Sequence, residues 1–200
     1  MMNRRTFLKA SAVAGASMLL PWIVPTVLSA LAWKWMFDPT FSIINWIFYN
    51  LGFIDVRVAW LGSPLGAMAS VIIVNTWRGM PFFAITLLAG LQTINPSVQE
   101  AAAIDGAAPW QRFRFVTWPL LKPVTMVVVL FSVIMTFADF QLVYILTGGG
   151  PSNSTHLFAT YAYQLAIATG LIGEGAAASL CMFPILFLVV IGQLLSLIHI

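Results

Sequence analysis

Residues 176–198 read AAASLCMFPILFLVVIGQLLSLI and contain no charged side chain. A helix needs about 20 such residues to cross the ~30 Å hydrocarbon layer of a bilayer. Apolar stretches of similar length, each with one charged residue, occur at residues 19–37, 66–90 and 124–146. Helix is the spanning form that we expect, because the sequence lacks the many alternating ten-residue strands of a membrane barrel. The sequence therefore predicts an all-α integral membrane protein with four transmembrane helices.

The overall composition argues against a water-soluble globular fold. Of the 200 residues, 60% are hydrophobic and 8% are charged, whereas soluble domains carry about 25% charged residues. The net charge of +3 does not point to nucleic acid, because the basic residues lie mostly beside apolar stretches, where they orient a chain in a bilayer. The lone Cys181 lies in an apolar run and has no second cysteine to pair with. We expect no metal site and no cofactor.

Three connections separate the four spans. The first covers residues 38–65, the second residues 91–122, and the third residues 147–175. Residues 157–172 of the third connection are apolar enough to form a short buried or interfacial helix, and a fifth membrane segment is the alternative there.

The distribution of basic residues predicts the orientation in the membrane. Two basic groups flank the spans, and they consist of Arg4, Arg5 and Lys9 before the first span and Arg112, Arg114 and Lys122 in the second connection. Because basic loops stay in the cytoplasm, we expect the N-terminus and residues 91–122 on the cytoplasmic side of a bacterial or archaeal inner membrane. Lys34, between Trp33 and Trp35, is typical of a snorkelling lysine in an interfacial anchor on the other side.

The second connection is the most polar part of the chain, and local rules predict two short helices within it. Asn95 is a suitable N-cap and Pro96 suits the first helical position. The alanines at 101–103 favour helix. Asp105 and Gly106 interrupt it, and Asp105 is a candidate cap for the next turn. The result is a compact polar hairpin with exposed aromatic residues, which is suited to docking against another protein.

The same stretch resembles the EAA loop of permeases from ATP-binding-cassette importers. That pattern has Glu-Ala-Ala, three residues, Gly, nine residues and Ile-x-Leu-Pro, and the positions that match it here are Glu100, Ala101, Ala102, Gly106 and Pro119. Val116 stands in place of the isoleucine and Trp118 in place of the leucine. Further residues resemble the carbohydrate branch with its maltose-type and glycerol-phosphate-type permeases, namely Asp105, Ala107, Trp110 and Phe113.

The resemblance implies a function and a set of partners. It implies a six-helix permease domain, of which residues 19–198 match the last four helices. It also implies that the loop, with Glu100 and Gly106 at the joint, transmits the motion of an ATP-binding subunit dimer to the membrane spans. The remaining partners would be a second permease subunit, an external or periplasmic solute-binding protein, membrane lipid and a sugar-like substrate. No catalysis by this chain is implied, and no Gly-x-x-x-x-Gly-Lys-Ser/Thr nucleotide motif occurs in it.

Four polar residues within the predicted spans are candidates for the substrate path. Arg78 lies near the middle of the second span, one turn after Asn75, at a position where a charge is costly unless it faces protein or water. Asp139 and Gln141 lie toward the outer end of the third span. These residues line the path in one interpretation. In the other, Arg78 forms a structural pair with Asp139 or a carbonyl, and Asp139 caps a helix end.

The two ends of the chain suggest alternative interpretations. Residues 1–18, with Arg4 and Arg5, resemble a basic twin-arginine leader, which belongs on exported proteins. The residues Ala30-Leu31-Ala32 would then offer a cleavage site. The final hexapeptide LSLIHI resembles read-through from a sequencing adaptor. The alternatives to a transporter subunit are therefore a truncated or chimeric permease fragment without activity, and a leader-directed exported or membrane-anchored protein.

Overall fold

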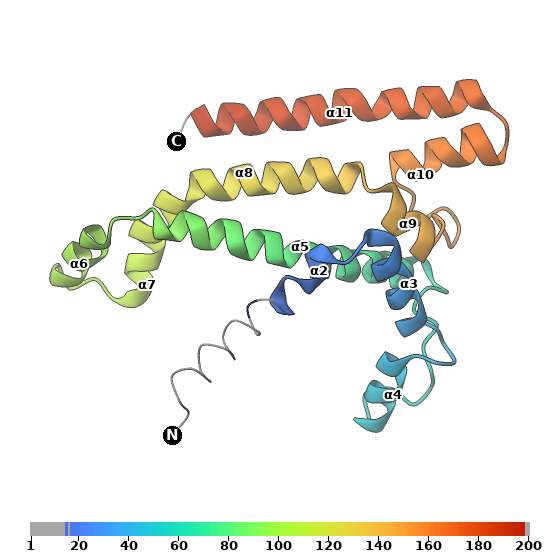
Figure 1. Cartoon of the computed structure of the whole chain (residues 1–200), viewed down its shortest axis with the longest axis horizontal. Helices are drawn as coiled ribbons and strands as arrows, with labels where there is room; N and C mark the ends of the chain where they lie inside the picture. Colours follow the sequence, from blue (N-terminus) through green and yellow to red (C-terminus); the bar gives the residue numbers. More distant parts are fainter. Residues whose placement is uncertain (1–14, 16, 199–200) are drawn as a thin grey trace. The chain divides into compact units, whose positions relative to one another are not determined.

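The computed structural model describes residues 15 and 17–198 (Figure 1). Helices connected by turns make up the described part of the chain, and no strand occurs in it. In chain order the helical segments are α2 Leu20–Ile23, α3 Thr26–Met36, α4 Ile43–Asn50, α5 Pro64–Gln92, α6 Pro96–Ile104, α7 Pro109–Arg112, the π-helical turn η1 Phe113–Thr117, α8 Trp118–Phe137, α9 Phe140–Leu146, α10 Phe158–Tyr163, the π-helical turn η2 Gln164–Ala168 and α11 Ile172–Ile198. The all-α prediction is confirmed.

The fold divides into two compact units, which are described separately below. Unit 1 contains the described residues up to Pro81 together with Thr136–Met182. Unit 2 contains Phe82–Met135 and the described residues from Phe183 onward. The long helices α5 and α11 each have residues in both units.

Three stretches of helix in the described residues are long and apolar enough to cross a membrane, namely Pro64–Gln92, Pro109–Phe137 and Ile172–Ser196. The first and second have 29 residues each, which gives a length of about 44 Å at 1.5 Å per residue. The first and third correspond to the spans expected at 66–90 and 176–198.

The span expected at residues 19–37 is not one continuous helix. Val24 has an extended backbone with a ψ of 129°, and it separates the four-residue helix α2 from α3. The cause is Pro25, since the ring of a proline disfavours helical geometry in the residue before it. The first span stays a prediction, with an interruption at the position of one of its prolines. Arg4 and Arg5, on which the leader interpretation rests, lie outside the described residues.

The span expected at residues 124–146 has different bounds in the structure. Helix α8 begins at Trp118, ends at Phe137 and is followed by a break, after which Asp139 caps the separate helix α9. The Asp139 carboxylate accepts a hydrogen bond from the backbone N–H of Leu142 at 3.1 Å. An aspartate that binds a free N–H group in this way favours the start of a new helix. The membrane-length helix is thus displaced toward the N-terminus.

The region at residues 157–172 contains a short helix rather than a full span. Helix α10 and the π-helical turn after it together cover Phe158–Ala168. Eleven helical residues extend about 16 Å, which is too short to cross a bilayer. Between the two interpretations of this region, the short helix is confirmed.

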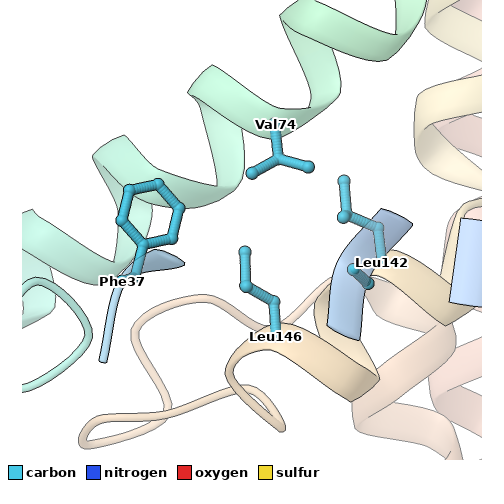
Figure 2. Packing of buried hydrophobic residues seen from close by; sticks show 5 residues of the cluster. Phe37, Val74, Leu142 and Leu146 are labelled. Carbon is cyan, nitrogen blue, oxygen red and sulfur yellow. The ribbon is translucent and has the colours of Figure 1, made fainter. Parts of the chain in front are cut away.

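The hydrophobic core of unit 1 joins α3, α5 and α9. Its buried residues are Ala30, Phe37, Val74, Leu142 and Leu146, and Figure 2 shows how Phe37, Val74, Leu142 and Leu146 point toward one another. Trp33 lies against this cluster, with ring centroids 5.4 Å from Phe37 and 5.5 Å from Trp77. Trp33 therefore serves the core.

The two other members of the expected anchor behave differently from Trp33. The side chain of Trp35 is 78% exposed, as expected of an interfacial residue. The Lys34 ammonium donates a hydrogen bond to the carbonyl of Ile145 at 3.0 Å, so it binds the end of α9. A lysine in this position also favours the negative end of that helix dipole.

In unit 2, α5 and α8 pack closely at a glycine. A Cβ atom added to Gly90 would lie 2.9 Å from Leu121 Cδ1 and 3.0 Å from Val124 Cγ1. Small residues of this kind let helices in a membrane approach each other and gain van der Waals contact. On α11, the Gln193 side-chain amide donates to the carbonyl of Met126 on α8 at 3.1 Å. The packing of unit 2 thus combines one close glycine contact with one interhelical hydrogen bond.

Replacing Gly90 with Val should destabilise the packing of α5 against α8, because the added methyl groups need space that Leu121 and Val124 occupy. Overpacking of this kind costs about 1–3 kcal/mol. Gly192→Val is the matched control, because nothing lies within 4 Å of a Cβ at Gly192. Thermal unfolding of the detergent-solubilised protein should give a clearly lower Tm for Gly90→Val than for the control. Equal Tm values would contradict the close packing.

Candidate functional site

The predicted coupling loop forms a helical hairpin in unit 2. Helix α6 begins as expected, with the Asn95 side chain accepting a hydrogen bond from Ser97 N at 3.0 Å and Pro96 in the first turn. It ends at Asp105, which is the C-cap residue. Gly106 follows with a φ of +81°, in the left-handed region that favours glycine. The expected helix break at Asp105 and Gly106 is confirmed, whereas the N-cap residue of α7 is Ala108.

Side-chain hydrogen bonds close the hairpin. The backbone N–H of Ala108 donates to Gln111 Oε1 at 2.8 Å and thereby satisfies one free donor at the start of α7. The Gln99 side-chain amide donates to Thr117 Oγ1 at 2.8 Å and connects α6 to η1. Thr117 is buried, with 8% of its surface exposed. The sequence reasoning missed Gln99, Gln111 and Thr117, because their partners become neighbours only when the hairpin closes.

Large apolar side chains are exposed on this hairpin. The exposed fraction is 86% for Ile104, 70% for Trp110 and 73% for Phe115. The Trp110 ring stacks on that of Phe113, with centroids 5.6 Å apart, so these two rings form one continuous apolar surface. We call these four residues the hairpin surface. Exposed apolar side chains such as the Trp110–Phe113 pair are typical of sites of interaction with a partner.

The residues expected at the coupling joint lie on or directly after α6, with one exception. Glu100, Ala101 and Asp105 are exposed, and Ala102 is half-buried. Pro119 is separate from them, in the first turn of α8 directly after η1. The structure therefore brings the acidic and small residues of the motif together on a single short helix.

A second polar site lies in unit 1, around Arg78 on α5. Arg78 Nη1 donates to Asp139 Oδ2 at 3.0 Å and forms an ion pair whose side chains are 20% and 18% exposed. Arg78 Nη2 donates to the hydroxyl of Thr26, in the first turn of α3. Thr26 was not singled out from the sequence. A charge at this depth is costly unless it is paired, and this arrangement pairs it.

The other candidates for the substrate path occupy less constrained positions. The Asn75 side-chain amide donates to Thr136 Oγ1 at 3.3 Å. Gln141, in the first turn of α9, is exposed. Arg78 Nε is buried and has no hydrogen-bond partner. The structure thus brings Arg78 and Asp139 together and shows both features of the structural interpretation, the ion pair and the helix cap.

Comparison with known proteins identifies relatives of the chain. A family model described as "Binding-protein-dependent transport system inner membrane component" matches residues 5–198. The "Trehalose/maltose transport system permease protein MalF" of Thermococcus litoralis is 40% identical over 176 residues, which are 88% of this chain and 59% of that protein. The "Sulfoquinovosyl glycerol transport system permease protein SmoG" of Agrobacterium fabrum is 37% identical over 169 residues, 84% of this chain and 54% of that protein.

Among solved structures, a bacterial ABC transporter involved in the import of the acidic polysaccharide alginate contains a similar fold. The TM-score is 0.82 at 22% sequence identity, with 99% of this chain and 68% of that chain covered. The chain spans less than two thirds of the length of the two curated relatives.

The pairing of Arg78 with Asp139 can be measured by a double-mutant cycle. Asp139→Asn removes the charge but keeps an acceptor for Leu142 N, so that the cap of α9 is retained. Arg78→Met removes the partner. Because each single variant breaks the same interaction, the double variant should lose less stability than the sum of the two, by about 0.5–3 kcal/mol. The measurement is unfolding in mixed detergent micelles, and strictly additive losses would show that the two groups do not interact.

Proposed function

Because the chain belongs to the family of binding-protein-dependent transport system inner membrane components, we propose that it is a transmembrane permease subunit of an ATP-binding-cassette importer for sugars or sugar-like polyols. The observation that carries this proposal is the spaced EAA-type motif, which forms an exposed helical hairpin that connects α5 to α8. The family and the three apolar helices identify a multi-pass inner membrane protein.

The substrate class is inferred from the relatives. Both curated relatives are permease proteins of transport systems that are named for trehalose and maltose or for sulfoquinovosyl glycerol. These compounds share a sugar unit with many hydroxyl groups. Asn75, Arg78, Asp139 and Gln141 offer donors and acceptors that suit hydroxyl groups, and we assign them to the edge of the substrate path. In this assignment the ion pair keeps Arg78 and Asp139 oriented.

The hairpin is the part that we assign to coupling. Its exposed apolar residues would enter a cleft of an ATP-binding subunit, and Glu100 would lie at the edge of that contact. Helix α7, η1 and α8 follow one another without a break from Pro109 to Phe137. A displacement of the hairpin by the ATPase dimer would therefore be passed directly to a membrane helix. A second permease subunit and a solute-binding protein complete the proposed assembly.

Gly106 provides the sharpest test of coupling. Gly106→Val places a β-branched residue at a φ of +81°, which costs about 1–2 kcal/mol for an L-residue, or a factor of about 5–30 in an equilibrium constant. Gly106→Asn is the matched control, since asparagine tolerates this conformation. Open space surrounds a Cβ at this position, so a difference between the two variants reports backbone geometry rather than a clash.

The measurement is co-purification of ATP-binding subunits with the tagged chain from its native host, identified by mass spectrometry. Recovery should fall for Gly106→Val and remain close to the unsubstituted level for Gly106→Asn. If both variants recover the same amount as the unsubstituted chain, the turn at Gly106 does not position a coupling contact.

The orientation is a separate prediction, based on the basic residues of the hairpin. We expect residues 91–122 and the N-terminus in the cytoplasm and residues 147–175 outside. Single cysteines at Gln111 and Ser152, in a Cys181→Ser background, test this with an impermeant thiol reagent on intact cells. Both native side chains are exposed. Position 152 should react and position 111 should react only after the cells are lysed, whereas the reverse pattern would invert the topology.

A further inference from the structure

Helix α4, Ile43–Asn50, lies in unit 1 in the connection between α3 and α5, and neither the coupling hairpin nor the polar site involves it (Figure 1). It is fixed at its start by Ser42, whose Oγ accepts from Asn45 N at 3.0 Å and donates to the carbonyl of Met36 at the end of α3. The position of α4 relative to α3 is therefore fixed, and the helix has one face toward the protein interior and one face toward the outside.

The inner face of α4 is held by a polar residue. Asn45 is 2% exposed. Its side-chain amide donates to the carbonyl of Val58 at 2.9 Å, and its Oδ1 accepts from Trp60 Nε1 at 2.9 Å and from Val58 N at 3.3 Å. The Phe48 ring packs beside it, with its centroid 5.9 Å from that of Trp60. These contacts fix the rotation of the helix about its axis.

The outer face of α4 is apolar and exposed. The exposed fraction is 47% for Ile43, 64% for Trp46, 41% for Ile47 and 59% for Tyr49. Asn50, the second asparagine of the helix, donates to its own backbone at the carbonyl of Trp46 at 2.7 Å. The outer face of α4 is thus mainly apolar, with exposed Asn50 as a polar exception, whereas the inner face contains the buried Asn45 beside Ile44 and Phe48.

The outer face continues into an open groove of about 810 Å³. Its lining includes Ile43, Trp46 and Tyr49 from the helix. Five polar residues also line it, namely Thr40, Ser42, Asn45, Asp55 and Arg57. Arg57 is exposed, and its Nη1 donates to the carbonyl of Thr40 at 3.1 Å. The groove therefore combines apolar side chains with a cationic group, Arg57, and an anionic group, Asp55, and Arg57 can pair with the phosphate of a lipid whose acyl chains cover the apolar side chains.

We propose that α4 is an interfacial anchor, with its outer face inserted among the phospholipids of the membrane and Arg57 at the level of the phosphates. The same unit contains the first part of the membrane-length helix α5, which begins at Pro64 and exposes 84% of Leu65. Tryptophan and tyrosine prefer the boundary between headgroups and acyl chains, because each has an apolar ring and a polar tip. A helix bound in this way buries its apolar face about 5–10 Å deep. The proposal holds for either orientation of the chain.

The exposed apolar side chains of the outer face are better suited to contact with lipid than with a soluble sugar or a protein. Sugar sites combine one or two rings with several polar side chains directed at the ligand, whereas both asparagines of α4 already donate to backbone carbonyls, Asn45 to Val58 and Asn50 to Trp46. A protein partner would require a complementary surface, while lipid is present beside any membrane-spanning helix. An exposed apolar helix next to a membrane span gains about 25 cal/mol for each Å² of apolar surface that leaves water.

The test is depth measurement by spin labelling of the full chain in nanodiscs made of phosphatidylethanolamine and phosphatidylglycerol. Nitroxide labels are placed by Trp46→Cys and, separately, Ile47→Cys in a Cys181→Ser background. Native Cys181, exposed on the apolar helix α11, provides the lipid reference, and Gln111→Cys provides the water reference. Collision with oxygen reports lipid, and collision with a water-soluble nickel chelate reports water.

The labels at 46 and 47 should collide more with oxygen than with the nickel chelate, at a depth of about 5–10 Å below the phosphates. Nickel accessibility equal to that at position 111 would show that the face is in water and would overturn the proposal. Exclusion of both reagents would show that protein covers the face, either a second copy or a subunit, and would also overturn it.

A second measurement avoids dependence on the cysteine variants. Quenching of intrinsic fluorescence by brominated lipid is compared between the unsubstituted chain and Trp46→Phe, which keeps an aromatic ring at the site. Trp46→Phe should lose a quenched component of the emission, whereas Trp60→Phe, at an inner position that contacts Asn45, should not. Equal quenching of the unsubstituted chain and Trp46→Phe would contradict insertion of Trp46 into lipid.

Discussion

The carboxylate of Asp139 makes two interactions at once, a helix cap and an ion pair, and the arrangement of unit 1 depends on both. One oxygen accepts the backbone N–H of Leu142 and starts α9, and the other receives the Arg78 guanidinium from α5. The same guanidinium reaches Thr26 at the start of α3. Three helices are thereby connected through one acidic and one basic side chain. Because α9 supplies Leu142 and Leu146 to the hydrophobic core, loss of this carboxylate would disturb both the ion pair with Arg78 and the packing of that core.

The need to satisfy backbone hydrogen-bonding groups explains where the helices break. In lipid each backbone N–H and C=O must find a partner within the protein, so an interruption requires a side chain or a proline to compensate. At the end of α8 the compensation is the Asp139 cap. At Val24 the break coincides with Pro25, which has no backbone N–H that needs a partner. Pro81 and Pro184, in contrast, lie inside α5 and α11 and do not end them. A proline in a membrane sequence is therefore a poor guide to helix ends unless the residue before it is considered as well.

Much of the fold could be predicted from the sequence, because apolar length and local capping are visible in it. The long helices α5 and α11, the N-cap Asn95 and the break at Gly106 all follow from a few adjacent residues. The bonds from Gln99 to Thr117 and from Arg78 to Thr26 could not be predicted, since they join residues far apart in the chain. The burial of Asn45 on α4 was missed for the same reason, as nothing local shows that its side chain points inward. The Arg78–Asp139 pair was one of two alternatives, and only the folded geometry distinguishes a paired charge from a free one.

The two connections of the hairpin formed by α6 and α7 differ in secondary structure. On one side, α6 is separated from α5 by residues 93–95, whose backbone is not helical. On the other side, α7, η1 and α8 form one unbroken rod from Pro109 to Phe137. The π-helical turn lies directly before Trp118 and Pro119, where its wider ring accommodates a residue that lacks an N–H donor. A displacement of the hairpin would therefore change the backbone angles at residues 93–95, next to α5, and would move α8 together with α7 as one helix. Of the two membrane helices attached to the hairpin, α8 would then move more than α5.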